Sequence, residues 1–231
     1  MRMLTLVPIG TSVGTGKYAA AVSLASQLLC EGHIIALPTD TIYGLACNAQ
    51  NTSAIQRLYS IKGRNCNKPL AICVGEVEDV KRWGVTDMLP KGLLTALLPG
   101  PVTIVLKRTE QLNPELNPST PNVGIRIPNH QFVREVVKGS GGILALTSAN
   151  LSNQVSSLCP EEFRDLWPKL SAVFDGGAIN DGICRGGSTI VDLTRQGSYS
   201  IIRDGSALSQ TIEVLERYGL LHEKLRSENS C

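Results

Sequence analysis

The chain has 231 residues, of which 42% are hydrophobic and 18% are charged. This length and composition are typical of one ample globular domain or two small ones, and they exclude an intrinsically disordered chain. The formal net charge of +2 is too small to predict nucleic-acid binding from bulk electrostatics, and no apolar run reaches the roughly 18 residues that a transmembrane helix needs.

The cysteines and histidines indicate reduced thiols and no metal centre of the protein's own. The seven cysteines include no C-x-x-C pair, and the three histidines lie far apart in the sequence. Residues 1–30 contain no Asp or Glu, as in a mitochondrial presequence, but they carry only one arginine. We therefore expect a cytoplasmic protein, with a mitochondrial fraction as the alternative.

The N-terminal residues contain an incomplete phosphate-loop motif. A Walker loop has four residues between its first glycine and its Gly-Lys pair, whereas five residues separate Gly10 from Gly16. Tyr18 also stands where the magnesium-binding hydroxyl should be. We therefore expect a flexible lead-in over 1–17, in which 2–9 could form a short strand.

A strand predicted over 33–37 follows the first predicted helix, 18–31, and leads into a cluster of small polar residues. Thr39, Asp40 and Thr41 offer three side-chain oxygens just beyond the strand end, where open α/β sheets bind their ligands. The alternative is a turn in which these side chains only cap the backbone.

The most basic stretch, KGRNCNKPL, follows a helix predicted over 52–61, with Thr52 as its N-cap. It places Lys62, Arg64 and Lys68 close together. Such cations repel one another unless an anion lies between them, and a bound polyphosphate would supply that anion. The alternative is a solvated basic loop.

The middle of the chain alternates between the two kinds of element. We expect strands over 70–74, 102–107 and 123–127, helices over 77–83, 90–98 and 129–137, and a polar loop over 109–121. Arg126 lies within the third of these strands, among apolar neighbours. It is either paired inside the protein or available to an anionic ligand.

The last third of the chain continues this alternation. We expect strands over 143–146, 172–175, 190–193 and 199–203, and helices over 161–170 and 209–218. The TSAN turn from Thr147 to Asn150 follows a strand end, where it could bind phosphate or ribose oxygens or form a plain turn, and Ser188 stands where the strand over 190–193 opens. The interleaving predicts a single α/β domain over 18–219, with a twisted mixed β-sheet flanked by helices, and a mobile tail over 220–231.

The polar residues at the predicted strand ends indicate a class of chemistry. Hydroxyls, cations and glycine-rich turns gather there, without a histidine to act as a base and without an acidic cluster to hold a metal. This inventory favours catalysis on an anionic substrate by positioning and charge stabilisation, as in nucleotidyl transfer. Mg²⁺ would arrive with ATP, held largely by phosphates and water.

Seven short motifs, in their order along the chain, resemble those of the YrdC-type threonylcarbamoyl-AMP synthase family. They are PTDTIYGL, KGR, PGPVT, GIRIP, TSAN, GGST and IIRDG. The resemblance extends over 32–205, and the chain is more similar to the single-domain YrdC proteins of animals than to the two-domain versions. It implies the YrdC-like fold, and a monomer is expected.

The resemblance also implies a reaction and its partners. L-threonine and bicarbonate, or CO₂, give a carbamate, which attacks the α-phosphorus of ATP. Pyrophosphate leaves and threonylcarbamoyl-adenylate remains. A tRNA threonylcarbamoyl-transferase partner complex would then transfer the threonylcarbamoyl group to adenosine 37 of tRNAs.

Roles for individual residues follow from the same resemblance. The residues implied in catalysis are Lys62, Arg64, Ser148 and Asn150. Those implied in ATP binding are Arg64, Lys68, Asn122, Ser148, Ser156 and Arg203. Those implied in threonine binding are Thr41, Cys73, Arg126, Leu146 and Ser188. Arg126 would pair with the carboxylate of threonine, which suits the fork geometry of a guanidinium.

Two departures from the family pattern and two alternatives remain. Many relatives have proline where this chain has Asn65, and some have a threonine-contacting histidine where it has Cys73.

The first alternative function is a non-catalytic module that binds double-stranded RNA or tRNA, since phosphate recognition alone would explain the basic loop. The second is a P-loop NTPase that uses residues 10–17.

Overall fold

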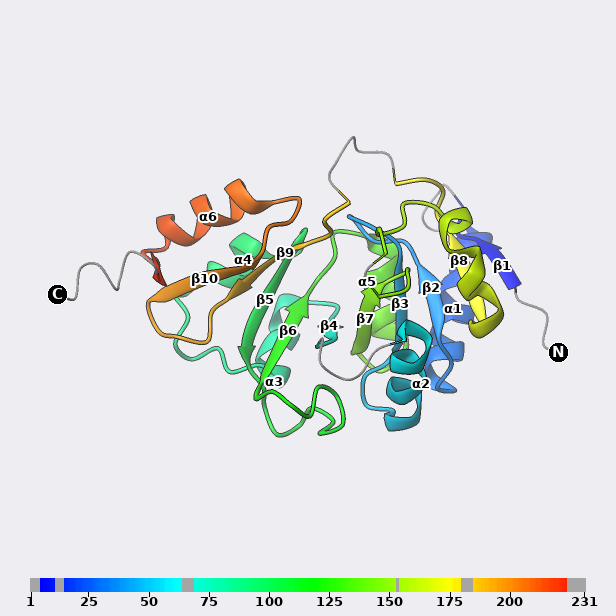
Figure 1. The fold of residues 1–231 in the computed structure, drawn as a ribbon, viewed down its shortest axis with the longest axis horizontal. Helices are drawn as coiled ribbons and strands as arrows, with labels where there is room; N and C mark the ends of the chain where they lie inside the picture. Colours follow the sequence, from blue (N-terminus) through cyan, green and yellow to red (C-terminus); the bar gives the residue numbers. More distant parts are fainter. Residues whose placement is uncertain (1–4, 11–14, 64–68, 153, 180–184, 224–231) are drawn as a thin grey trace.

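The computed structural model describes residues 5–10, 15–63, 69–152, 154–179 and 185–223, and these residues build one mixed β-sheet covered by helices (Figure 1). The strands are β1 (Thr5–Pro8), β2 (Ile35–Leu37), β3 (Gly44–Asn48), β4 (Ala71–Cys73), β5 (Val102–Lys107), β6 (Asn122–Arg126), β7 (Leu144–Ser148), β8 (Ala172–Asp175), β9 (Thr189–Asp192), β10 (Ser198–Arg203) and β11 (Leu221–His222). The helices are α1 (Gly16–Cys30), α2 (Thr52–Lys62), η1 (Val77–Asp79), α3 (Val80–Trp83), α4 (Leu93–Leu97), α5 (Gln131–Gly139), η2 (Pro160–Lys169) and α6 (Leu208–Arg217).

The strand order of the sheet is β1-β8-β2-β3-β7-β4-β6-β5-β9-β10-β11. The sheet contains parallel pairs, such as β4 with β6 and β5 with β9, and antiparallel pairs, such as β3 with β7. In Figure 1 the β1, β8, β2, β3 and β7 strands occupy the N-terminal end of an elongated molecule, and β5, β9 and β10 lie towards the C-terminus. The predicted α/β domain with a mixed sheet is confirmed.

Helices cover both faces of the sheet because its strands are apolar on both sides. In β2, Ile35 and Leu37 pack with α1 and α5 in one buried cluster, while Ala36 between them belongs to a second, larger cluster. The second cluster includes buried residues of α2, η2, α3, α4 and α6. In the described residues, no helix is both long and apolar enough to cross a bilayer.

Several predicted element boundaries differ from the observed ones. The N-cap of α2 is Asn51, whose Oδ1 accepts the backbone N–H of Ala54 at 3.0 Å, and not Thr52. The helix predicted over 90–98 is shortened to α4. The strand β3 was missed, and β7 continues through Ser148, so half of the TSAN turn lies within a strand.

Both predicted terminal segments contribute elements to the domain. Thr5–Pro8, inside the expected lead-in, forms β1 and pairs in parallel with β8 at the edge of the sheet. The start of α1 lies within the lead-in as well, capped by Thr15. At the other end, β11 pairs with β10 and belongs to the sheet. Residues 11–14 and 224–231 lie outside the described residues.

Candidate functional site

A cavity of about 150 Å³ opens at the ends of the central strands. Its polar lining residues include Thr39, Thr103, Arg126, Thr147, Ser148, Ser188 and Arg203. Leu146 lines the cavity and also packs in the cluster formed with α1 and α5, so the cavity adjoins that cluster. Strand ends from both halves of the sheet therefore meet at this cavity.

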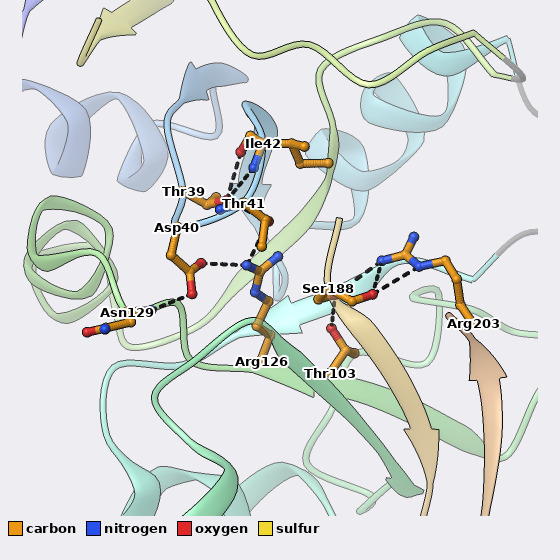
Figure 2. A network of polar contacts seen from close by, with 9 residues as sticks. All are labelled: Thr39, Asp40, Thr41, Ile42, Thr103, Arg126, Asn129, Ser188 and Arg203. Atoms are coloured by element: carbon orange, nitrogen blue, oxygen red, sulfur yellow. Dashed lines mark hydrogen bonds and ion pairs between the residues drawn. The ribbon is translucent and has the colours of Figure 1, made fainter. Parts of the chain in front are cut away.

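One wall of the cavity carries Arg126, which projects from the end of β6 (Figure 2). Its Nη2 donates to Oδ1 of Asp40 at 2.5 Å and to Oγ1 of Thr41 at 2.8 Å. Both partners come from the turn after β2, whose backbone is fixed by Thr39: the Thr39 hydroxyl accepts the N–H of Thr41 and of Ile42. Arg126 is thus paired inside the protein as well as facing the cavity.

The opposite wall carries Ser188 and Arg203. Nε and Nη2 of Arg203 donate to the carbonyl oxygen of Ser188 at 3.1 and 2.7 Å, and Nη2 also reaches Oγ of Ser188 at 3.1 Å. The hydroxyl of Thr103 lies 2.7 Å from the hydroxyl of Ser188. Partial burial and the nearby charge of Arg126 lower the pKa of the Arg203 guanidinium. Two positive groups therefore face one small space, which favours an anionic ligand.

Lys62 does not reach into this cavity. Its side chain is buried, with 1% of the residue exposed, and Nζ donates to the carbonyl oxygens of Ser148, at 2.7 Å, and of Asn150. Nζ also lies 3.2 Å from Oδ1 of Asn150. The carbonyl oxygen of Lys62 accepts from Ser152, so the end of α2 is tied to the TSAN turn on both sides. The structure places Lys62 as a clamp on that turn.

Of the other predicted nucleotide-binding residues, some line a cavity and some do not. Arg64 and Lys68 lie outside the described residues. Ser148 lines the cavity, while Asn150 holds its own turn through hydrogen bonds to Leu151 and Gln154. The remaining two are Asn122, which lines an adjoining cavity of about 250 Å³, and Ser156, whose carbonyl oxygen accepts from Arg185 and which lines neither cavity.

Among the predicted threonine-binding residues, Arg126, Leu146 and Ser188 line the cavity. Thr41 does not line it but accepts a hydrogen bond from Arg126. Cys73 does not line it. This cysteine is fully buried in β4, and burial raises the pKa of its thiol to about 12. Its side chain is a core group, because the α1 and α5 cluster covers it.

Sequence reasoning missed two contributors to the site. Thr103 was read only as part of a strand, although its alternation with buried Val102 and Ile104 already placed it on the opposite face. The sequence showed Asp40 as one of three side chains that offer an oxygen after β2, but its pairing with Arg126 was not predicted. The two residues are 86 positions apart, so no local signal links them.

The fold and this cavity are typical of α/β proteins that bind a small anionic molecule at strand ends. A family model for Sua5, YciO and YrdC proteins, described as "Telomere recombination", matches residues 27–205. Proteins named threonylcarbamoyl-AMP synthase from Bos taurus and Homo sapiens are 53% identical over 219 and 208 residues. These alignments cover 94% and 88% of this chain and 78% and 74% of the relatives. The chain belongs to the YrdC-type family, as its motifs predicted.

Solved structures agree with this assignment. Sua5 from P. abyssi, solved in complex with L-threonine, is 26% identical with a TM-score of 0.79, and the match covers 95% of this chain. The chain spans 62% of the length of that protein. E. coli YciO, 20% identical with a TM-score of 0.75 over 89% of this chain and 96% of its own, shares the fold. The prediction of an enzyme is confirmed as well, since the curated relatives are named as synthases.

Proposed function

We propose that this protein is a threonylcarbamoyl-AMP synthase, which condenses L-threonine, bicarbonate and ATP. The observation that carries the proposal is the cavity between Arg126 on one wall and Ser188 with Arg203 on the other, in a chain 53% identical to named synthases. A relative solved with L-threonine, at 26% identity, adds support.

The cavity suits an amino acid that must be held by its polar groups. The Arg126 guanidinium binds the α-carboxylate, for which a fixed fork of N–H donors is well shaped. The hydroxyl of Ser188, oriented by Thr103 and Arg203, accepts from or donates to the other polar groups of threonine. With one end of threonine held, its amine can add to CO₂ derived from bicarbonate and form a carbamate.

The second step joins the carbamate to the nucleotide. A carbamate oxygen attacks the α-phosphorus of ATP, the bond to the bridging oxygen breaks, and pyrophosphate leaves with the electron pair. Ser148 at the cavity and Asn122 in the adjoining cavity contact the nucleotide, together with Arg64, Lys68 and Ser156. Mg²⁺ enters as part of the Mg–ATP substrate, which screens the charge of the leaving group. Lys62 holds the TSAN turn, which presents Ser148 to the nucleotide, and this contact supports its role in catalysis.

The product is a reactive mixed anhydride, whose threonylcarbamoyl group must be transferred to an acceptor molecule. The proposal is that a tRNA threonylcarbamoyl-transferase partner moves its threonylcarbamoyl group to adenosine 37 of tRNA. We place the protein in the cytoplasm as a monomer, with a mitochondrial fraction as the alternative location.

The test is pyrophosphate release from Mg–ATP by the purified chain, with L-threonine and bicarbonate each added and omitted. Release that requires both supports the synthase. Release without threonine indicates a general ATP hydrolase and contradicts the proposal. A folded protein that releases none, but binds double-stranded RNA or tRNA with steep salt dependence, would instead be the binding module.

A further inference from the structure

A buried carboxylate lies behind the arginine of the cavity. Asp40 accepts a hydrogen bond from Nη2 of Arg126 with Oδ1, and from the backbone N–H of Asn129, at 3.0 Å, with Oδ2. The side chains of Asp40 and Arg126 are 10% and 6% exposed. Figure 2 shows Asp40 joined to Arg126 on one side and to Asn129, which precedes α5, on the other. Asp40 itself does not line the cavity.

The contacts of Arg126 fix which of its donors remain for a ligand. A guanidinium has five N–H groups, two of them on Nη2. Asp40 and Thr41 accept from Nη2 and so use both of these. The buried Nε of Arg126 has no hydrogen-bond partner among the described residues. The other terminal nitrogen lies on the side of the guanidinium away from Asp40 (Figure 2).

We propose that Asp40 is a positioning residue for the substrate's carboxylate, acting through Arg126. It holds Nη2 on the protein side, so that the other terminal nitrogen of the guanidinium is presented to the ligand. This inference rests on the proposed function, because it concerns how the same cavity binds L-threonine.

Two physical effects support the role. An arginine side chain loses conformational entropy when it is ordered. A preformed hydrogen-bond network orders it during folding, so that this entropy is not lost again when the ligand binds. A buried guanidinium also needs a counter-charge, and removing one partner of a buried ion pair leaves an uncompensated charge. Asp40 both orients the Arg126 guanidinium and neutralises its charge, whereas Thr41 only orients it.

The test compares Asp40→Asn and Asp40→Ala with the wild-type chain in threonine-dependent pyrophosphate release. We expect the KM for L-threonine to rise at least about tenfold in Asp40→Ala, by the scale of a lost charge-assisted hydrogen bond, and less in Asp40→Asn. The KM for ATP should stay within about twofold, because Arg126 faces the amino acid. Binding of L-threonine, measured by calorimetry, should weaken in parallel.

Glu76→Gln is the matched control. Glu76 pairs with Arg134 through a similar hydrogen bond of 2.9 Å, but on the surface and away from the cavity. Its KM for threonine should equal that of the wild type. Equal rises in the KM for threonine and ATP in Asp40→Ala would indicate a merely structural role and overturn the inference.

A double-mutant cycle keeps the inference testable if Asp40→Ala does not fold. If Asp40 acts through Arg126, Asp40→Asn should change threonine binding little further in an Arg126→Gln background. A full effect of Asp40→Asn in that background contradicts the inference, as does an unchanged threonine KM in folded Asp40→Asn. A wild-type chain that neither binds threonine nor releases pyrophosphate would refute the proposed function itself, and the inference with it.

Discussion

At the scale of single residues, the buried lysine at the end of α2 shows how a cation can support a site through the turn that it holds. Lys62 has 1% of its surface exposed, and its ammonium group is surrounded by oxygens of Ser148 and Asn150. Burial of an ammonium without such oxygens would cost several kcal/mol. The arrangement therefore stabilises the TSAN turn in one conformation.

Lys62→Met should remove this clamp while keeping most of the side-chain volume. We expect pyrophosphate release to fall about a hundredfold, because the groups that the turn presents are no longer preorganised. The free energy of unfolding should fall by about 1–3 kcal/mol, since buried carbonyl oxygens lose their donor. Urea denaturation and the release assay measure the two effects.

Lys138→Met is the control, because Lys138 also ends a helix but forms an exposed ion pair with Glu76. Its effect on stability should lie within about 1 kcal/mol, and its activity should be unchanged. Wild-type activity in Lys62→Met would contradict the clamp.

His130, at the start of α5, should make stability depend on pH. Burial lowers its pKa from the ordinary value of 6.5, although the charge of Asp40 opposes the shift. The unfolded chain therefore binds a proton more readily than the folded one, so stability is complete above pH 6.5 and falls as the pH drops below that value. His130→Gln should flatten this fall, which thermal denaturation at a series of pH values measures.

Residue identities predicted much of this site, but not its pairings. Arg126 and Ser188 were expected in the threonine pocket and line the cavity. The burial of Lys62 and the pairing of Arg126 with Asp40 depend on chain segments 86 to 88 positions apart. The residues near a cation in the sequence predict that it has a role in the site, but they do not predict which distant oxygen atoms accept its hydrogen bonds.

At the scale of elements, the turn after β10 sets the position of β9. A Cβ atom added to Gly205 would lie 2.2 Å from the backbone N of Thr189 and 2.3 Å from the carbonyl carbon of Ser188. The backbone N–H of Ser206 donates to the carbonyl oxygen of Gly187, and that of Ala207 donates to the hydroxyl of Thr189. The glycine of the IIRDG motif is therefore required because two backbones meet there.

Gly205→Ala should move Ser188 and weaken threonine binding. No such Cβ fits without a backbone shift, so we expect the KM for L-threonine to rise several-fold and the melting temperature to fall, by the scale of an overpacked site of about 1–3 kcal/mol. Gly16→Ala is the control, because a Cβ there meets nothing within 4 Å. A threonine KM unchanged in folded Gly205→Ala would show that the turn does not position Ser188.

The strands were predicted unevenly for a physical reason. The runs that became β5 and β8 are rich in β-branched and aromatic residues, and their predicted limits coincide with the observed ones. The stretch GLACN of β3 has none of these residues and begins with glycine, so its β-propensity is low. It is a strand because β2 and β7 hydrogen-bond to it from both sides.

At the scale of the whole molecule, the cavity joins the two halves of the sheet. Its lining residues come from the turn after β2, from β3, β7 and β4, and from β6, β5, β9 and β10. A ligand bound there contacts both halves and binds only the folded chain. Its binding energy therefore adds to the stability of the whole domain.

L-threonine should raise the free energy of unfolding by about 2.7 kcal/mol at a concentration of 100 times its Kd. Urea denaturation with and without the amino acid measures the shift. Arg126→Gln should show a much smaller shift at the same concentration, while Glu76→Gln should match the wild type. An equal shift in Arg126→Gln would remove this arginine from the threonine site.

The wide separation in sequence of the cavity's lining residues also has a consequence for biosynthesis. Thr39 emerges early from the ribosome, whereas Arg203 emerges about 160 residues later, roughly ten to thirty seconds at ordinary elongation rates. The incomplete chain lacks the second wall during that interval and cannot gain stability from the ligand. Such non-local topologies also fold slowly, because loop closure must precede the contacts that reward it. The amino acid can therefore act on folding only as a late ligand, after the C-terminal strands have joined the sheet.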